Sequence, residues 1–158
     1  MAVLEITKLG NEVLRTICET VDLNTEHDYI QSLISNMIDT VIKSKGVGIA
    51  APQVGISKRV IVVKNVETGI FFSMINPEIT WTSFDKECKE EGCLSVLDDS
   101  GQPIHKNIWR YKRVRVTWQD INGEIHEELI KNPLQARIIQ HEIDHLNGKL
   151  FIDYLDNV

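Results

Sequence analysis

The stretch Gln140-His141-Glu142-Ile143-Asp144-His145 lies near the end of the 158-residue sequence and carries its most distinctive chemistry. In a helix, His141 and His145 lie one turn apart on one face, so both imidazoles can reach the same metal ion. Glu142 lies about 100° around the helix from His141, which places its carboxylate beside the metal. A carboxylate there can take a proton from a metal-bound water. The stretch therefore predicts a helical metal site of the H-E-x-x-H type.

The residues around this stretch predict a buried helix. Asn132 can cap its start, Pro133 suits the first helical position, and Gly148 suits the position just past the end. A helix that is apolar nearly all round is buried on most sides, and buried imidazoles need partners such as a metal. The apolar residues that wrap this helix are Leu134, Ala136, Ile138, Ile139, Ile143 and Leu146.

The middle of the chain is rich in predicted strands. Asp120-Ile121-Asn122-Gly123 is a hairpin signal, because the Asn-Gly pair favours a tight turn. Asn76-Pro77 is expected to end one strand before the next begins. The β-branched or alternating runs that predict strands are residues 60–63, 71–75, 79–84, 113–119 and 125–129.

A second helix is predicted from about Glu26 to Ser44, with Thr25 and Asp28 forming a capping box at its start. Residues 46–55, rich in glycine and alanine, are predicted to form a tight, close-packed loop. No repeat or linker divides the sequence, which favours a single catalytic domain over residues 1–158. We therefore predict an α+β fold in which antiparallel strands pack around a central, largely buried C-terminal metal-binding helix.

Composition excludes several classes of protein. Hydrophobic residues make up 42% of the chain and charged residues 25%, as in ordinary soluble globular proteins. The net charge of −6 argues against direct nucleic-acid binding, and no apolar run is long enough to span a membrane. The N-terminus resembles neither a signal peptide nor a transit peptide, and three cysteines disfavour a disulfide framework. These features predict a cytoplasmic location.

The third metal ligand is expected upstream of the helix. Catalytic sites usually have three protein ligands and one open position. No histidine follows His145, and the only later acids are Asp153 and Asp156. Cys93 is the best candidate, because Gly92 before it allows close approach of the backbone. A thiolate with two imidazoles suits zinc or ferrous iron.

The remaining polar residues near these motifs receive simpler interpretations. His27, His105 and His126 are expected to be solvated, with His105 in a polar loop. Asp144 is expected either to be a solvated helix residue or to accept a hydrogen bond from a metal-bound imidazole.

Three segments together resemble the peptide deformylases. Residues 46–53 (GVGIAAPQ), 91–95 (EGCLS) and 141–145 (HEIDH) resemble the three motifs of this family in order and spacing. The flanking segments 146–148 and 150–153 are similar to the usual continuation. The resemblance covers most of the chain and implies a short form of the enzyme that lacks a C-terminal extension.

The resemblance implies hydrolysis of the N-formyl group from the N-terminal formyl-methionine of new polypeptides, with release of formate. Cys93, His141 and His145 would hold one divalent metal ion per chain. Fe²⁺ would be the ion in the cell, and Zn²⁺, Ni²⁺ or Co²⁺ could occupy the site in a purified sample. Metal-bound water would attack the formyl carbon, with Glu142 as general acid and base.

Further roles follow from the same resemblance. Gln53 and the backbone N–H of Leu94 would form the site that stabilises the oxyanion. Glu91, Arg110 and Asp144 are expected to support the metal ligands, with Arg110 paired to Glu91. The residues expected to bind substrate are Gly48, Ile49, Gly92, Leu134 and Ile138.

The sequence departs from the family pattern in two places. Residues 97–103 form a longer, acidic turn after the Cys-Leu-Ser motif, which bears on substrate contacts from this turn. The chain ends at Val158, without the C-terminal helix that helps some bacterial members dock on the ribosome. Association with the ribosome would then occur without that helix.

Two alternatives remain open from the residues alone. One is a metallopeptidase or deacylase with a different substrate, which hydrolysis of acetylated or internal peptides would distinguish. The other is a structural metal site in an inactive or binding protein, which replacement of Glu142 by Gln would distinguish.

Overall fold

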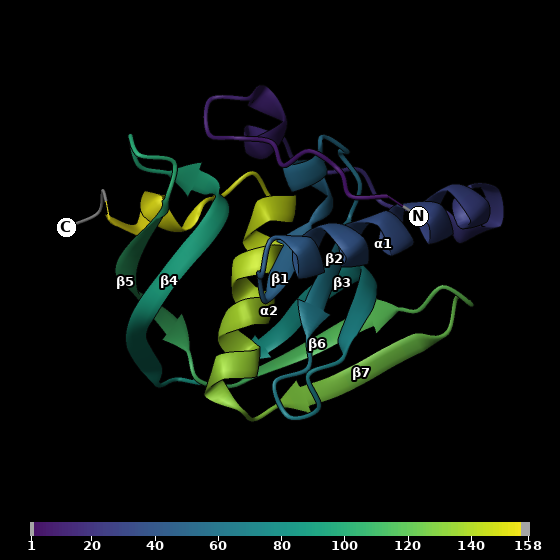
Figure 1. Cartoon of the computed structure of the whole chain (residues 1–158). Helices are drawn as coiled ribbons and strands as arrows, with labels where there is room; N and C mark the ends of the chain where they lie inside the picture. The colour runs from purple at the N-terminus through teal and green to yellow at the C-terminus, as the bar shows by residue number, and fades with distance from the viewer. Residues whose placement is uncertain (1, 156–158) are drawn as a thin grey trace.

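The computed structural model describes residues 2–155, which form two antiparallel sheets with helix α2 (Pro133–Leu146) between them (Figure 1). The larger sheet has five strands in the order β1-β2-β3-β6-β7, and the smaller one pairs β4 with β5. The predicted α+β fold around a buried C-terminal helix is confirmed, since eleven of the fourteen residues of α2 are buried. The strands are β1 (Gly48–Ala50), β2 (Val60–Lys64), β3 (Phe71–Thr82), β4 (Lys86–Leu97), β5 (Pro103–Tyr111), β6 (Val114–Gln119) and β7 (Ile125–Ile130).

Helix α2 has the predicted ends. The side chain of Asn132 accepts hydrogen bonds from the backbone N–H groups of Leu134 and Gln135, which would otherwise lack partners. Past the other end, Gly148 has φ 74°, and a Cβ there would lie 2.6 Å from the carbonyl oxygen of Arg15. Both the left-handed backbone and the close contact require glycine at this position.

Helix α1 (Leu23–Lys43) begins earlier than predicted. Asp22 is its cap and accepts a hydrogen bond from the N–H of Asn24. The Glu26 carboxylate accepts a hydrogen bond from the N–H of Asp22. The two carboxylates thus provide acceptors for backbone N–H groups at the start of the helix. The predicted capping box of Thr25 and Asp28 is therefore wrong.

Two predicted boundaries within residues 46–82 are also wrong. The predicted loop contains the short edge strand β1 and a 3₁₀ helix, η2 (Ala51–Val54), because an edge strand of small residues needs only one neighbour. Strand β3 runs through the predicted break at Asn76-Pro77, with a register shift between Ile75 and Glu78. Asn76 accommodates the irregularity with φ 50° and a side-chain hydrogen bond to the carbonyl of Val21.

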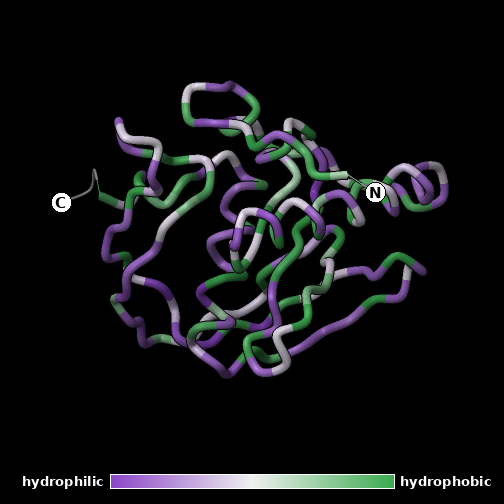
Figure 2. Tube along the Cα trace, viewed as in Figure 1, coloured by the Kyte–Doolittle hydropathy of each residue, from purple (hydrophilic) through white to green (hydrophobic). Residues whose placement is uncertain are grey.

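The apolar residues form three clusters. One joins α2 to the five-stranded sheet and includes Met74 and Ile139, and another joins α1 to the opposite face and includes Met37 and Ile49. Figure 2 shows β2, which both clusters share, as a nearly continuous hydrophobic segment. A third cluster joins β4 and β5 to the segment that follows α2, where the 3₁₀ helix η3 (Phe151–Leu155) lies. Its buried members are Cys93, Val96, Ile108, Leu150 and Phe151.

A further short 3₁₀ helix, η1 (Glu12–Arg15), precedes α1. Among the described residues, no helix combines the length and the hydropathy needed to cross a membrane.

Candidate metal centre

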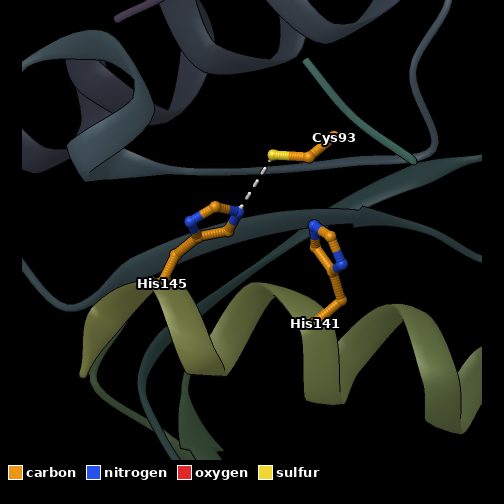
Figure 3. Close-up of side chains that lie close together, drawn as sticks. All are labelled: Cys93, His141 and His145. Carbon is orange, nitrogen blue, oxygen red and sulfur yellow. Dashed lines mark hydrogen bonds between the residues drawn. The ribbon is translucent and has the colours of Figure 1, made fainter. Parts of the chain in front are cut away.

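Cys93, His141 and His145 lie together between β4 and α2 (Figure 3). Their candidate ligand atoms all lie within 4.8 Å of one another, and Sγ of Cys93 is 3.5 Å from Nε2 of His145. All three side chains are buried, with His145 only 1% exposed. The structure thus brings together the three ligands expected from the sequence.

Regular backbone geometry explains this convergence. His141 and His145 are separated by one turn of α2 and project from one face. Along β4, side chains alternate between two faces, so Glu91 and Cys93 are both buried on the side of the helix whereas Gly92 between them is not. The strand therefore places a carboxylate and a thiol against the two imidazoles.

The site fits a divalent metal ion. A thiolate and two imidazoles are the donors that zinc and ferrous iron accept. Burial lowers the pKa of His145, which favours the neutral imidazole that a metal requires. Burial opposes the charged form of His141 too, but its hydrogen bonds with Cys93 and Glu91 raise its pKa to about 10, so a metal must displace a proton there. Nδ1 of His145 and Oε2 of Glu142 are buried without a hydrogen-bond partner among the described residues, which is unusual for buried polar atoms. The unpartnered carboxylate oxygen can accept a hydrogen bond from a water or a substrate group beside the ligands.

Glu142 is suited to proton transfer. Its side chain is buried, and its Oε1 lies 3.7 Å from Nε2 of His141. Burial raises the pKa of Glu142 to about 7, against the opposing effect of His141. A carboxyl group with a pKa near neutrality can both accept and donate a proton.

Glu91 is the centre of a buried network of ionic hydrogen bonds. Its Oε1 accepts a hydrogen bond of 2.8 Å from Nδ1 of His141, and both of its oxygens accept bonds from Arg110. Burial disfavours the charged form, but the bonds from Arg110 and His141 outweigh it and lower the pKa of Glu91 to about 2. The carboxylate thereby fixes the orientation of the imidazole, leaving Nε2 free for a metal.

Asp144 has neither of the two expected roles. Its Oδ2 accepts hydrogen bonds from Nη1 of Arg110 at 2.6 Å and from the hydroxyl of Tyr154 at 2.7 Å. Its partner is thus an arginine and not an imidazole: Asp144 lies about 100° around α2 from His145, and Nδ1 of His141 is already bonded to Glu91. The contact joins Arg110 to the helix.

Gln53 and Leu94 border the candidate ligands. Oε1 of Gln53 accepts a hydrogen bond from the N–H of Ala50, which turns Nε2 toward Sγ of Cys93 at 3.5 Å and Oγ of Ser95 at 3.2 Å. Leu94 follows Cys93 on β4 and is half-buried. Both residues line the same cavity.

A cavity of about 360 Å³ opens over the candidate ligands. A Cβ on Gly48 would lie 3.0 Å from Cγ of Glu142, so this glycine allows β1 to approach the helix. The side chain of Ile49 packs in the α1 cluster and not in the cavity, because strand alternation turns it away from Gly48. The side chain of Ile49 therefore does not face the cavity, and binding of substrate by Ile49 stays a prediction that concerns its backbone. The other residues expected to bind substrate line the cavity: Gly48, Gly92, Leu134 and Ile138.

Two functional neighbours were missed by sequence reasoning. His105 is exposed as expected, but it lies on β5 opposite Gly92 and lines the cavity. Arg137 is only 5% exposed and donates a hydrogen bond to Glu91. The position of His105 beside the site follows only from the pairing of β4 with β5. Arg137 did have a signal in the sequence, because it is a charged residue one turn before His141 on an otherwise apolar helix.

An α+β fold with buried Cys-His-His candidate ligands beside a carboxylate is the arrangement of a metal-dependent hydrolase. The polypeptide deformylase family matches residues 3–158. The chain belongs to the peptide deformylase family, and it is a hydrolase that removes the N-formyl group from new polypeptides.

Individual relatives cover nearly the whole chain. The peptide deformylase of Halothermothrix orenii is 45% identical over 97% of this chain and 94% of its own length. The crystal structure of the Thermotoga maritima peptide deformylase has a TM-score of 0.86 and 40% identity, covering 96% of this chain and 97% of that one. An actinonin-bound peptide deformylase from Acinetobacter baumannii has a TM-score of 0.85 and 39% identity, with coverage of 96% and 97%.

Proposed function

We propose that Cys93, His141 and His145 bind one divalent metal ion and that Glu142 transfers the protons in removal of the formyl group from N-terminal formyl-methionine. The observation that carries this proposal is the unpartnered, buried Oε2 of Glu142 beside the three candidate ligands. A metal bound there supplies a Lewis acid and lowers the pKa of water to about 7. We further propose Fe²⁺ as the ion in the cell, with Zn²⁺, Ni²⁺ or Co²⁺ able to replace it, because all accept sulfur and nitrogen ligands.

Glu142 is proposed to act twice. It first takes a proton from the water that attacks the formyl carbon, and it then gives this proton to the departing amine, which leaves poorly as an anion. The raised pKa of Glu142, about 7, supports both steps. Its position 3.7 Å from His141 keeps the carboxylate close to the ligands without using it as one.

Gln53 and the backbone N–H of Leu94 are proposed to stabilise the oxyanion that forms on the formyl oxygen. Gln53 suits this role because its Oε1 is held by Ala50 while its Nε2 faces Cys93. An amide donor carries no charge, so it does not repel the metal. One such fixed donor contributes about 3 kcal/mol to stabilisation of the transition state.

The peptide is proposed to lie against β1, with the methionine side chain in the cavity. Strand β1 is at the edge of its sheet, so its backbone at Gly48 and Ile49 can pair with an extended peptide. Leu134, Ile138 and Gly92 offer walls for the thioether chain. A relative from Acinetobacter baumannii is bound to Met-Ala-Ser, which supports a peptide of this kind as a ligand here.

Glu91 and Arg110 are proposed to hold the ligands in place. Glu91 fixes His141, and Arg110 joins Glu91 to Asp144 on α2. The cytoplasmic location, the association with the ribosome and the lack of direct nucleic-acid binding stay predictions.

The test measures the rates at which the enzyme, loaded with metal under anaerobic conditions, hydrolyses formyl-Met-Ala, acetyl-Met-Ala and an internal peptide. We expect hydrolysis of the formyl substrate to dominate. Glu142→Gln should lower kcat by a factor on the order of 10² to 10⁴ while the metal content is kept. Glu128→Gln, an exposed residue on β7, is the matched control.

Two outcomes would contradict the proposal. Preference for acetylated or internal substrates would favour another deacylase or a metallopeptidase. Full activity of Glu142→Gln would remove the assigned proton carrier. Activity that decays in air with the native metal but persists with nickel would identify iron as that metal.

A further inference from the structure

The candidate metal ligands come from two separate parts of the fold. Cys93 is on β4, which pairs only with β5 in the described structure, whereas His141 and His145 are on α2. No backbone ladder joins the two-stranded sheet to the five-stranded sheet within residues 2–155. In Figure 1, β4 and β5 lie on one side of α2 and the large sheet lies on the other. The position of the thiol relative to the imidazoles therefore depends on contacts between α2 and these two strands, which include side-chain hydrogen bonds from α2.

Arg137 on α2 forms hydrogen bonds to both β4 and β5. It lies one turn before His141, and its Nη1 donates hydrogen bonds of 2.7 Å to Oε2 of Glu91 and to the carbonyl of Ile108 on β5. Its Nη2 donates to the carbonyl of Glu87 on β4. One buried guanidinium thus holds both strands of the small sheet against the helix.

Arg137 also acts on a candidate ligand through Glu91. The two carboxylate oxygens divide their partners, since Oε2 accepts from Arg137 and Oε1 accepts from Nδ1 of His141. Glu91 lies two residues before Cys93 on the same face of β4. Movement of Arg137 would therefore shift the thiol and turn the imidazole at the same time.

We propose that Arg137 is a positioning residue that sets the distance between Cys93 and the two histidines, and so sets the affinity and coordination geometry of the bound metal. The proposal rests on the ligand roles given above. Burying a charged side chain beside a carboxylate contributes little net stability compared with apolar packing, so a gain in geometry accounts better for an arginine here. The planar fork of arginine can meet several acceptors at fixed angles, which lysine cannot.

The experiment measures cobalt binding by metal-free protein. Co²⁺ is titrated into wild type, Arg137→Met and Arg137→Lys, and the visible absorption spectrum reports thiolate coordination and geometry. Arg113→Met is the matched control, because Arg113 is exposed and pairs with Asp85 away from the site. We expect Arg137→Met to weaken Co²⁺ binding about 10- to 100-fold and to change the spectrum. Arg137→Lys should recover part of the affinity, and Arg113→Met should match wild type.

Kinetics separate this role from the lining of the cavity. Arg137 also lines the cavity, so loss of a substrate contact would raise KM and leave cobalt binding unchanged. A positioning role predicts a lower kcat together with the weaker and altered cobalt site. Wild-type affinity and spectrum in both variants would overturn the proposal, whatever their thermal stability. If Arg137→Met does not fold, Arg137→Lys provides the test by itself. Wild-type cobalt affinity in Arg137→Lys would then overturn the proposal.

The failure of this proposal is distinct from failure of the ligand assignment. A wild-type cobalt spectrum without thiolate absorption would overturn the role of Cys93 and, with it, that of Arg137. Normal thiolate absorption with unchanged variants would overturn only the role of Arg137.

Discussion

Sγ of Cys93 lies 3.5 Å from Nε2 of His145, although 52 residues separate them in the chain. The contact joins β4 and α2, the two elements that contribute the candidate ligands Cys93, His141 and His145. A thiol and an imidazole at this distance can share one metal ion after small adjustments. The site therefore depends on how the small sheet packs against the helix.

Replacement of Cys93 tests this contact directly. We expect Cys93→Ser to lower metal affinity more than about 100-fold, since loss of a ligand should exceed the loss of a residue that only supports one. Deformylation should fall with the metal content. Cys88→Ser is the matched control, because Cys88 is a half-buried free cysteine on the same strand. Equal metal content in the two variants, measured by atomic absorption, would contradict the ligand role.

Replacement of Gly48 tests the close approach of β1 to Glu142, the proposed general base. In Gly48→Ala the new Cβ would lie 3.0 Å from Cγ and 3.2 Å from Cδ of Glu142, so the carboxylate must move by a few tenths of an ångström. We expect kcat to fall roughly tenfold, because displaced catalytic groups lose rate steeply. Metal content should not change, since neither histidine is touched. An unchanged kcat in steady-state assays would show that Glu142 tolerates displacement.

The lowered pKa of Glu91 predicts that the free energy of unfolding depends on pH. Hydrogen bonds from Arg110 and His141 overcome burial and lower the pKa of Glu91 from 4.5 to about 2 in the folded, metal-free protein. A lowered carboxyl pKa stabilises the fold fully above the unfolded value and loses this effect as the pH falls from about 4.5 toward 2. The shift corresponds to roughly 3 kcal/mol at neutral pH.

The measurement is urea unfolding of metal-free wild type and Glu91→Gln across this pH range. The variant should be less stable at pH 7, and the difference between the two proteins should shrink as the pH falls below 4.5. Glu90→Gln, at an exposed position on the same strand, should match wild type throughout. A difference that stays constant with pH would mean that the charge of Glu91 is not responsible.

Ile139 tests the packing of α2 against the large sheet. It is fully buried in the cluster that includes Met74 and Ile143, so Ile139→Ala should lower the free energy of unfolding by about 2 to 5 kcal/mol. Ile125→Ala is the control, because Ile125 is 77% exposed and should change stability by less than about 0.5 kcal/mol. Chemical denaturation measures the free energy of unfolding of both variants. Equal losses in the two variants would show that the packing of Ile139 against the large sheet does not stabilise the fold.

Local signals in the sequence determined much of this protein. The helix around His141 could be predicted with its ends, because capping by Asn132, proline at the first position and glycine after the last turn act within a few residues. The same short-range geometry put His141 and His145 on one face. The hairpin at residues 120–123 was predictable for the same reason.

The tertiary structure decided how distant segments meet. The partner of Asp144 is Arg110 and the partner of His141 is Glu91, which spacing along the helix could not establish. Arg137 crosses to carbonyl groups of β4 and β5, and strand pairing alone puts His105 beside Gly92. Helix periodicity and capping are set by neighbouring residues, whereas strand pairing and buried ionic contacts depend on how separate elements pack. The pair of histidines and, through the family resemblance, the pairing of Arg110 with Glu91 could therefore be predicted from the sequence. The bonds from His141 and Arg137 to Glu91 appeared only in the folded chain.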